Sequence, residues 1–266
     1  MKRPISLLLL LLLLSAGSVT AQRKVIALRN VTVIDMTGAP PKRNVTVVVS
    51  GTRITAIGRT NRLRISRDAQ IVDGTGKFLT PGLWDMHVHF TRVDTTFPLF
   101  IANGVTGVRN MGGELDQLVR WRADLAAGKL IGPRIVACGP IVDGPPPAAH
   151  GPTVVVKDAA EARAMVARLK RGGADCVKVY DRLPRDAYFA VIDEAKKMRM
   201  PVVGHVPLSL TSVEASEAGQ RSIEHLGSVL ESSSTLESEL FNEERNTEPI
   251  TDPSDFPPLI GARGSR

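Results

Sequence analysis

The pattern of apolar and polar positions changes along the chain and predicts two kinds of structure. In residues 24–80, short runs rich in Val, Ile and Thr occur at 25–34, 45–50 and 53–57, with a further run at 70–72. Turn residues, including Ser50 and Gly51, separate these runs, which is typical of strands joined by tight connections. This pattern predicts a small β domain over residues 22–80, arranged as a β-sandwich.

From residue 81 onwards, short apolar runs alternate with longer stretches of helical periodicity. The pattern predicts strands at 81–90, 105–110, 134–138, 175–180, 201–206 and 222–226, and helices at 114–127, 159–171, 185–198 and 211–218. Strands that alternate with helices are typical of parallel β/α units. The expected fold class for this part of the chain is therefore α/β with a parallel sheet.

The first residues have the pattern of an export signal. Lys2 and Arg3 precede an apolar run at 5–14, and small residues follow up to Ala21. The run is too short to span a bilayer but has the length of a signal-peptide core. We therefore predict a signal peptide over 1–21, an exported protein that is periplasmic or secreted, and no stable membrane anchor. An uncleaved N-terminal anchor is the alternative.

Charge and cysteine content narrow the classes of function. The formal net charge is +7, but the basic residues are scattered, without the runs or aromatic interleaving of a nucleic-acid surface. The sequence therefore predicts no nucleic-acid partner. Cys138 and Cys176 are too few for a disulfide framework. Both fall in predicted core strands, so we expect buried free thiols.

Four of the five histidines fall at or near the ends of predicted strands. His87 and His89 share one face of a strand because side chains alternate, although an isolated pair of this kind also occurs on ordinary surface strands. His205 and His225 follow later strands, and the carboxyl ends of parallel strands meet at one edge. We expect these four imidazoles to converge, which would allow them to bind metal. His150 lies in a loop and is expected at the surface.

Lys178 lies between Val177 and Val179 in a predicted core strand, on the same face as Cys176 and Tyr180. A lysine in this position is expected to have a lowered pKa or to be chemically modified. Carboxylation by CO2 would convert the amine to a carbamate anion that could bridge two cations. A lysine at the rim of the sheet that extends to solvent is the alternative.

Four segments together resemble the amidohydrolase superfamily, in the branch that is similar to imidazolonepropionase and the metal-dependent Xaa-Pro dipeptidases. They are PGLWDMHVHF at 81–90, DCVKVY at 175–180, PVVGHV at 201–206 and SIEHL at 222–226. The resemblance implies an incomplete (β/α)8 TIM-like barrel over residues 81–227, with about six of the eight strands. The segment 22–80 would then be the small accessory domain of the family.

The resemblance also implies a binuclear metal site. In the family pattern, His87 and His89 bind one ion, a carboxylated Lys178 bridges two, and His205 and His225 bind the second. Zinc is the implied metal, with two ions per site. The implied reaction is hydrolysis of a C–N bond in a small amide, cyclic amide or dipeptide by a metal-activated water.

The chain departs from the family pattern after residue 227. The family places a catalytic aspartate after the eighth strand, whereas residues 228–266 form an acidic and Pro/Ser-rich tail without recognisable seventh and eighth strands. Neither Asp252 nor Asp255 follows a predicted strand, so we assign no catalytic residue. The alternative function is a catalytically inactive, truncated fragment that keeps the metal-ligand residues.

Two further residues are candidates for contact with substrate. Tyr180 shares a face with Lys178, so it is a candidate substrate-binding residue, although a packing role is equally compatible with its position. Arg109 could bind a substrate carboxylate or form a structural ion pair. Association into a homo-oligomer is left open by the sequence.

Overall fold

The computed structural model of the chain describes residues 24–90, 92–236, 239 and 242. It divides into two compact units, the first ending at Pro81 and the second beginning at Gly82. The predicted signal peptide, Asp252 and Asp255 lie outside the described residues, so the structure does not test them. Within the described part, no helix is long and apolar enough to cross a membrane.

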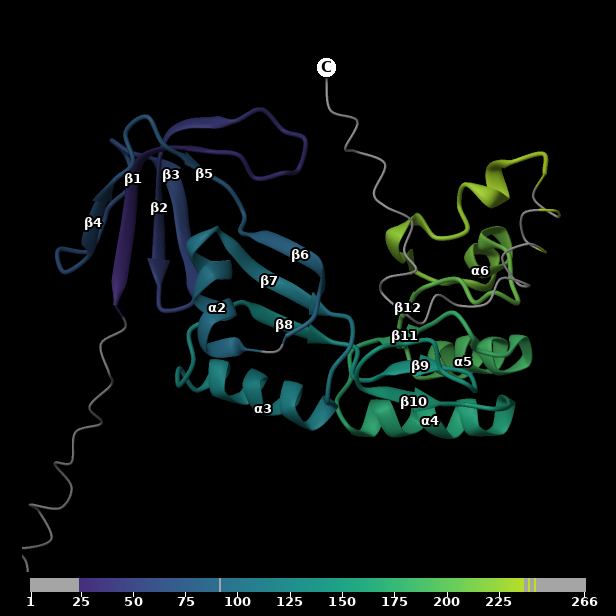
Figure 1. The fold of residues 1–266 in the computed structure, drawn as a ribbon. Coiled ribbons are helices and arrows are strands. Elements are labelled where there is room, and N and C mark those ends of the chain that lie inside the picture. The colour runs from purple at the N-terminus through teal and green to yellow at the C-terminus, as the bar shows by residue number, and fades with distance from the viewer. Residues whose placement is uncertain (1–23, 91, 237–238, 240–241, 243–266) are drawn as a thin grey trace, which may run out of the picture. The chain divides into compact units, whose positions relative to one another are not determined.

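The first unit is a single five-stranded sheet (Figure 1). Its strands are β1 (Val25–Val33), β2 (Lys42–Ser50), β3 (Arg53–Arg59), β4 (Gln70–Asp73) and β5 (Phe78–Leu79). The order is β3-β2-β1-β4, and β5 also pairs with β1. Residues 24–81 contain no second sheet opposite this one, so the predicted sandwich is not found there. The reason is that β4 and β5 add to β1 instead of forming another layer.

The second unit has an α/β fold with parallel sheets, which confirms the predicted fold class. One sheet has the order β6-β7-β8 and the other the order β10-β9-β11-β12-β13. The strands are β6 (Leu83–Val88), β7 (Val105–Asn110), β8 (Arg134–Ala137), β9 (Ile141–Asp143), β10 (Thr153–Val155), β11 (Val177–Val179), β12 (Val202–Gly204) and β13 (Ser222–Ile223). The prediction of six strands missed β9, which lies in a Pro/Gly-rich stretch that ends at Pro152, and β10, which directly follows that stretch.

Strand β8 is tied to the segment that leads into β11. The backbone N–H of Asp175 donates to the carbonyl of Ala137 at 2.7 Å, and the Asp175 carboxylate accepts from the Ala137 N–H at 2.8 Å. This pairing brings the next residues, Cys138 and Cys176, to a Cα–Cα distance of 4.4 Å, where they form a disulfide. The prediction of free thiols was therefore wrong, because a count of cysteines says nothing about which strands become neighbours.

The helices follow the predicted pattern with one addition. They are α2 (Val93–Ala102), α3 (Leu115–Ala126), α4 (Ala159–Arg171), α5 (Arg185–Lys197) and α6 (Ser212–Ala218). Four were predicted to within one residue at each end. The Asp158 side chain caps α4, and Thr211 with Glu214 forms a capping box on α6. Helix α2 was missed because Pro98 and β-branched residues interrupt its helical pattern.

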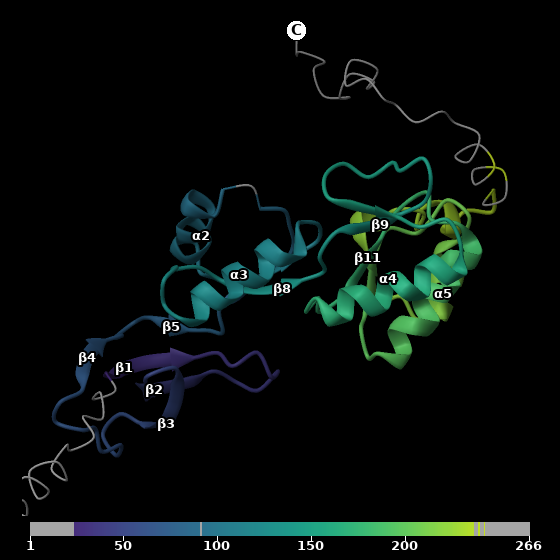
Figure 2. The same ribbon diagram turned by 90° about the horizontal axis from the view of Figure 1, so that it is seen from below.

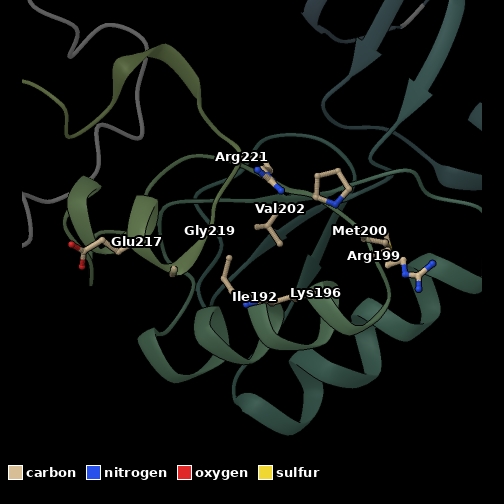
Figure 3. Close-up of a pocket in the computed structure, with 10 residues that line it drawn as sticks. Ile192, Lys196, Arg199, Met200, Val202, Glu217, Gly219 and Arg221 are labelled. Atoms are coloured by element: carbon tan, nitrogen blue, oxygen red, sulfur yellow. The ribbon is translucent and has the colours of Figure 1, made fainter.

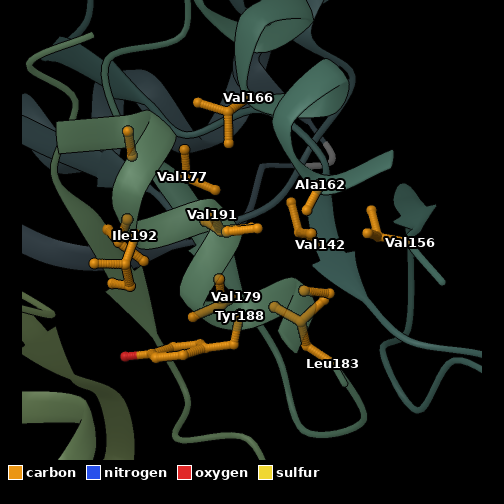
Figure 4. Close-up of a cluster of buried hydrophobic side chains, with 14 of the residues drawn as sticks. Val142, Val156, Ala162, Val166, Val177, Val179, Leu183, Tyr188, Val191 and Ile192 are labelled. Atoms are coloured by element: carbon orange, nitrogen blue, oxygen red, sulfur yellow. The ribbon is translucent and has the colours of Figure 1, made fainter. Parts of the chain in front are cut away.

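The main core of the second unit lies between the helices and the five-stranded sheet. Helices α4 and α5 lie side by side along β9 and β11 (Figure 2). Val142 and Val179 from the strands pack with Val166, Tyr188 and Val191 from these helices, and all five are buried (Figure 4). The buried Tyr188 hydroxyl donates to Gln220 at 2.9 Å. This packing holds the strands whose carboxyl ends carry the candidate site.

Candidate metal centre

One cavity of about 210 Å³ collects the residues that were predicted as metal ligands. Its walls include His87, His89, Lys178, His205 and His225. The ring centroids of His87 and His225 are 4.6 Å apart, those of His87 and His89 are 5.3 Å apart, and those of His205 and His225 are 5.2 Å apart. The structure therefore brings together all five residues, and their role as ligands stays a prediction.

The secondary structure positions these side chains at the carboxyl ends of parallel strands. His87 lies in β6 and His89 follows it, while His205 follows β12. His225 lies in a short 3-10 helix, Glu224–Leu226, and not in the strand that was predicted to reach residue 226. Its backbone is left-handed, with φ of 60°. Strained backbone of this kind is found at functional sites, where the surrounding structure holds it in place.

Two of the four imidazoles are oriented by carboxylates. His87 Nδ1 lies 2.8 Å from the Glu224 carboxylate, and His205 Nδ1 lies 2.7 Å from the Asp181 carboxylate. When the Nδ1–H group donates a hydrogen bond to a carboxylate, Nε2 of the same neutral ring is the nitrogen with a free lone pair. Metal-binding histidines have the same arrangement, with the second ring nitrogen donating to a carboxylate or carbonyl.

Glu224 is also the centre of a buried network. Its carboxylate accepts from the Arg109 guanidinium at 2.6 Å and from the Ser222 hydroxyl at 2.6 Å. Arg109 donates in addition to the Met86 carbonyl at 2.7 Å. Arg109 thus forms a structural ion pair, which is the second of the two roles that the sequence leaves open. Sequence reasoning missed Glu224, whose only signal was its position directly before His225.

Lys178 is 1 % exposed, which excludes the alternative of a rim lysine that extends to solvent. Burial lowers its pKa to about 8, an effect that the charges of Glu224 and Asp181 oppose. Its Nζ lies 5.7 Å from the centre of the Tyr180 ring. A buried amine with a lowered pKa is more often neutral, and the neutral amine is the form that reacts with electrophiles.

The charge of Lys178 acts on the neighbouring histidines. Burial lowers the pKa of His87 and of His89, and the positive charge of Lys178 lowers both further. Lowered pKa values favour neutral imidazole, which is the form that binds metal. The same positive charge would oppose the binding of any cation, unless Lys178 were neutralised or converted to an anion.

The donor atoms of the cavity suit a metal ion, whereas their geometry suits it less well. Imidazole nitrogens are ligands that zinc prefers. The carboxylates that bind Nδ1 of His87 and of His205 leave Nε2 of each ring free to bind an ion. Within residues 24–90, 92–236, 239 and 242, however, no three His, Cys, Asp or Glu side chains are already arranged to hold an ion. The donor chemistry fits zinc, and the ligand geometry requires adjustment or an additional ligand.

Tyr180 and His150 also line the cavity. The Tyr180 ring stacks on His205 at a centroid distance of 4.1 Å, and burial raises the pKa of its hydroxyl. This contact supports a packing role, while the predicted contact with substrate stays a prediction. His150 was expected at the surface. It is exposed, but it also contributes to the cavity wall.

A larger cavity of about 570 Å³ lies elsewhere (Figure 3). Figure 3 shows Lys196 in the last turn of α5, Arg199 just after this helix, Val202 at the start of β12 and Arg221 before β13. His205 lies beyond the opposite end of the same strand. The charged residues Lys196, Arg199 and Arg221 are exposed. This cavity therefore lies away from the converging histidines and is not the candidate centre.

Comparison with protein families gives one match. The model of the Amidohydrolase family matches residues 78–241, which include every predicted ligand residue. A search of curated proteins found no match.

Several solved structures share the fold. A candidate prolidase from Bifidobacterium longum is 28 % identical, with a TM-score of 0.67 over 76 % of this chain and 54 % of its own. The bottromycin amidohydrolase is 25 % identical, with a TM-score of 0.66 over 77 % and 43 %. A Xaa-Pro dipeptidase with bound methionine is 22 % identical and shows the fold alone, with a TM-score of 0.64 over 84 % and 66 %. The chain spans about half the length of the first two.

Proposed function

Because the chain belongs to the amidohydrolase family, we propose that it is a metal-dependent hydrolase of C–N bonds in small amides, cyclic amides or dipeptides. The observation that carries this proposal is the convergence of four imidazoles and the buried Lys178 on one cavity. The likeness to a candidate prolidase supports dipeptides as the first substrates to test.

The residues that would hold two zinc ions are those of the cavity. His87 and His89 would bind one ion and His205 and His225 the other, with Lys178 between them as a carbamate. Zinc supplies two effects when bound: it lowers the pKa of a water molecule and polarises a carbonyl. Asp181 and Glu224 contribute by fixing the orientation of two of the imidazoles.

We expect Lys178 to carry a carbamate. The ammonium group would first lose one proton. The neutral amine would then attack CO2, forming a C–N bond and releasing a second proton, so the group changes from a cation to an anion in two deprotonations. Because burial lowers the pKa of Lys178 to about 8, the neutral fraction and carbamate formation should rise as pH increases through this value. The measurement is carbon NMR of protein equilibrated with ¹³C-bicarbonate and zinc. Lys178→Met should remove the carbamate signal, whereas Lys196→Met, at an exposed position, should keep it.

A second candidate function is metal binding without turnover. None of the residues that line the cavity in the described part of the chain is an aspartate or a glutamate, so no carboxylate is placed there to accept a proton from water. Asp181 and Glu224 are occupied in holding His205 and His87. This observation favours a protein that binds zinc but does not hydrolyse amides.

Turnover and zinc affinity together separate the two functions. The full chain with zinc is assayed on dipeptides with C-terminal proline and on lactams, and zinc affinity is measured by competition with a chromophoric chelator. For a hydrolase, a chelator should stop turnover, zinc should restore it, and His205→Ala should abolish it. Glu217→Ala is the control that should keep zinc and turnover, since Glu217 is exposed and lines the separate cavity of about 570 Å³. Zinc binding without turnover supports the second function, and absence of both contradicts each proposal.

A further inference from the structure

A second cavity, of about 410 Å³, adjoins the candidate metal centre. The two cavities share His89, Ile141 and His150 as common wall residues. The remaining walls of the second cavity come from the residues after β6 and β7, from the first turns of α3 and from the loop before β10. A molecule that reacts at the imidazoles could therefore extend directly into this second space.

The walls of the second cavity are largely apolar. Phe90, Leu118 and Trp121 line it, and Leu118 is 1 % exposed. Phe90 packs edge-on against Trp121 at a centroid distance of 6.1 Å and against Phe97 at 5.1 Å. This aromatic cluster continues into the hydrophobic core, which fixes the position of the wall. Its volume and lining resemble pockets that bind small molecules, which range from about 300 to 1,000 Å³.

One buried polar group in this wall lacks a partner. Asn110 is 1 % exposed, and its Oδ1 accepts from the Gly112 N–H at 3.2 Å. Its Nδ2 makes no hydrogen bond to any described residue. Buried donors without an acceptor are rare in native proteins. A carbonyl oxygen on a bound molecule could supply the missing acceptor after a small movement of the wall.

We propose that the second cavity is a specificity pocket for an apolar or aromatic side chain of the substrate, with a substrate carbonyl as the acceptor for Asn110. The substrate class is then an amide or dipeptide with a large apolar residue beside the scissile bond. This inference rests on the proposed function, because it assumes that the scissile bond lies at the imidazoles.

The test compares two neutral probes, N-acetyl-L-phenylalanine methylamide and N-acetylglycine methylamide, by calorimetry on the zinc-loaded full chain. Burial of one phenyl group should make the first bind about tenfold to a hundredfold more tightly. Gln117→Phe places a ring in the cavity from an exposed position of α3 and should remove this preference. Asp116→Phe adds the same ring at an exposed neighbour outside the cavity and should keep it.

Tryptophan fluorescence locates the binding. The chain has two tryptophans, so Trp84→Phe leaves Trp121 alone, and the phenylalanine probe should then change its emission. Three outcomes would contradict the proposed pocket. They are equal affinity for the two probes, a preference that persists in Gln117→Phe, and no saturable binding of the phenylalanine probe. Selective binding without amide turnover would contradict only the proposed function. Turnover without selectivity would contradict only this inference.

Discussion

Replacing Glu224 with alanine is expected to lower the free energy of unfolding by about 3–5 kcal/mol. The Glu224 carboxylate is 9 % exposed and pairs with the Arg109 guanidinium, which is 10 % exposed, at 2.6 Å. Removing the carboxylate leaves the guanidinium charge buried without its partner, and His87 also loses its carboxylate. Urea titration followed by circular dichroism measures the change.

Two further variants make this expectation specific. Glu194→Ala removes the ion pair with Lys197, whose side chain is 66 % exposed, and should cost only about 0–1 kcal/mol. Arg109→Leu combined with Glu224→Ala removes both buried charges and should recover part of the loss. A loss for Glu224→Ala no larger than that for Glu194→Ala would show that the buried network does not stabilise the fold.

Removing the disulfide by Cys138→Ala with Cys176→Ala is expected to lower the free energy of unfolding by about 4 kcal/mol. The bond spans 38 residues, and closing a loop of this length restricts the unfolded chain by about that amount. The measurement is urea unfolding with and without reductant. Reductant should destabilise the natural chain and leave the double variant unchanged.

Thiol titration under denaturing conditions gives an independent check on the disulfide. The natural chain should show free thiols only after reduction, whereas two free thiols before reduction would contradict the bond. Structural disulfides are typical of proteins in oxidising compartments. Export itself stays a prediction, because the signal-peptide residues lie outside the described part of the chain.

The sequence alone determined the parts of this protein that depend on local rules. Alternation along a strand places His87 and His89 on one face, and both do line the cavity. Helical periodicity predicted where α4 and α6 begin to within one residue, and Asp158 and Thr211 cap these helices in the structure. The carboxyl ends of parallel strands lie at one edge of a sheet, and this rule predicted that His205 lies near His87 and His89. Each inference needs only a few neighbouring residues or one topological regularity.

Only the tertiary structure decided which distant groups become partners. Glu224 and Arg109 are 115 residues apart in sequence, and neither carries a local signal for the other. Helix α2 forms despite Pro98 because Phe97 packs into the core at 1 % exposure. The Cys138–Cys176 bond depends on β8 meeting the segment before β11. Such pairings arise when whole helices and strands pack together. Many weak contacts between distant residues decide this packing, and a local sequence pattern does not specify them.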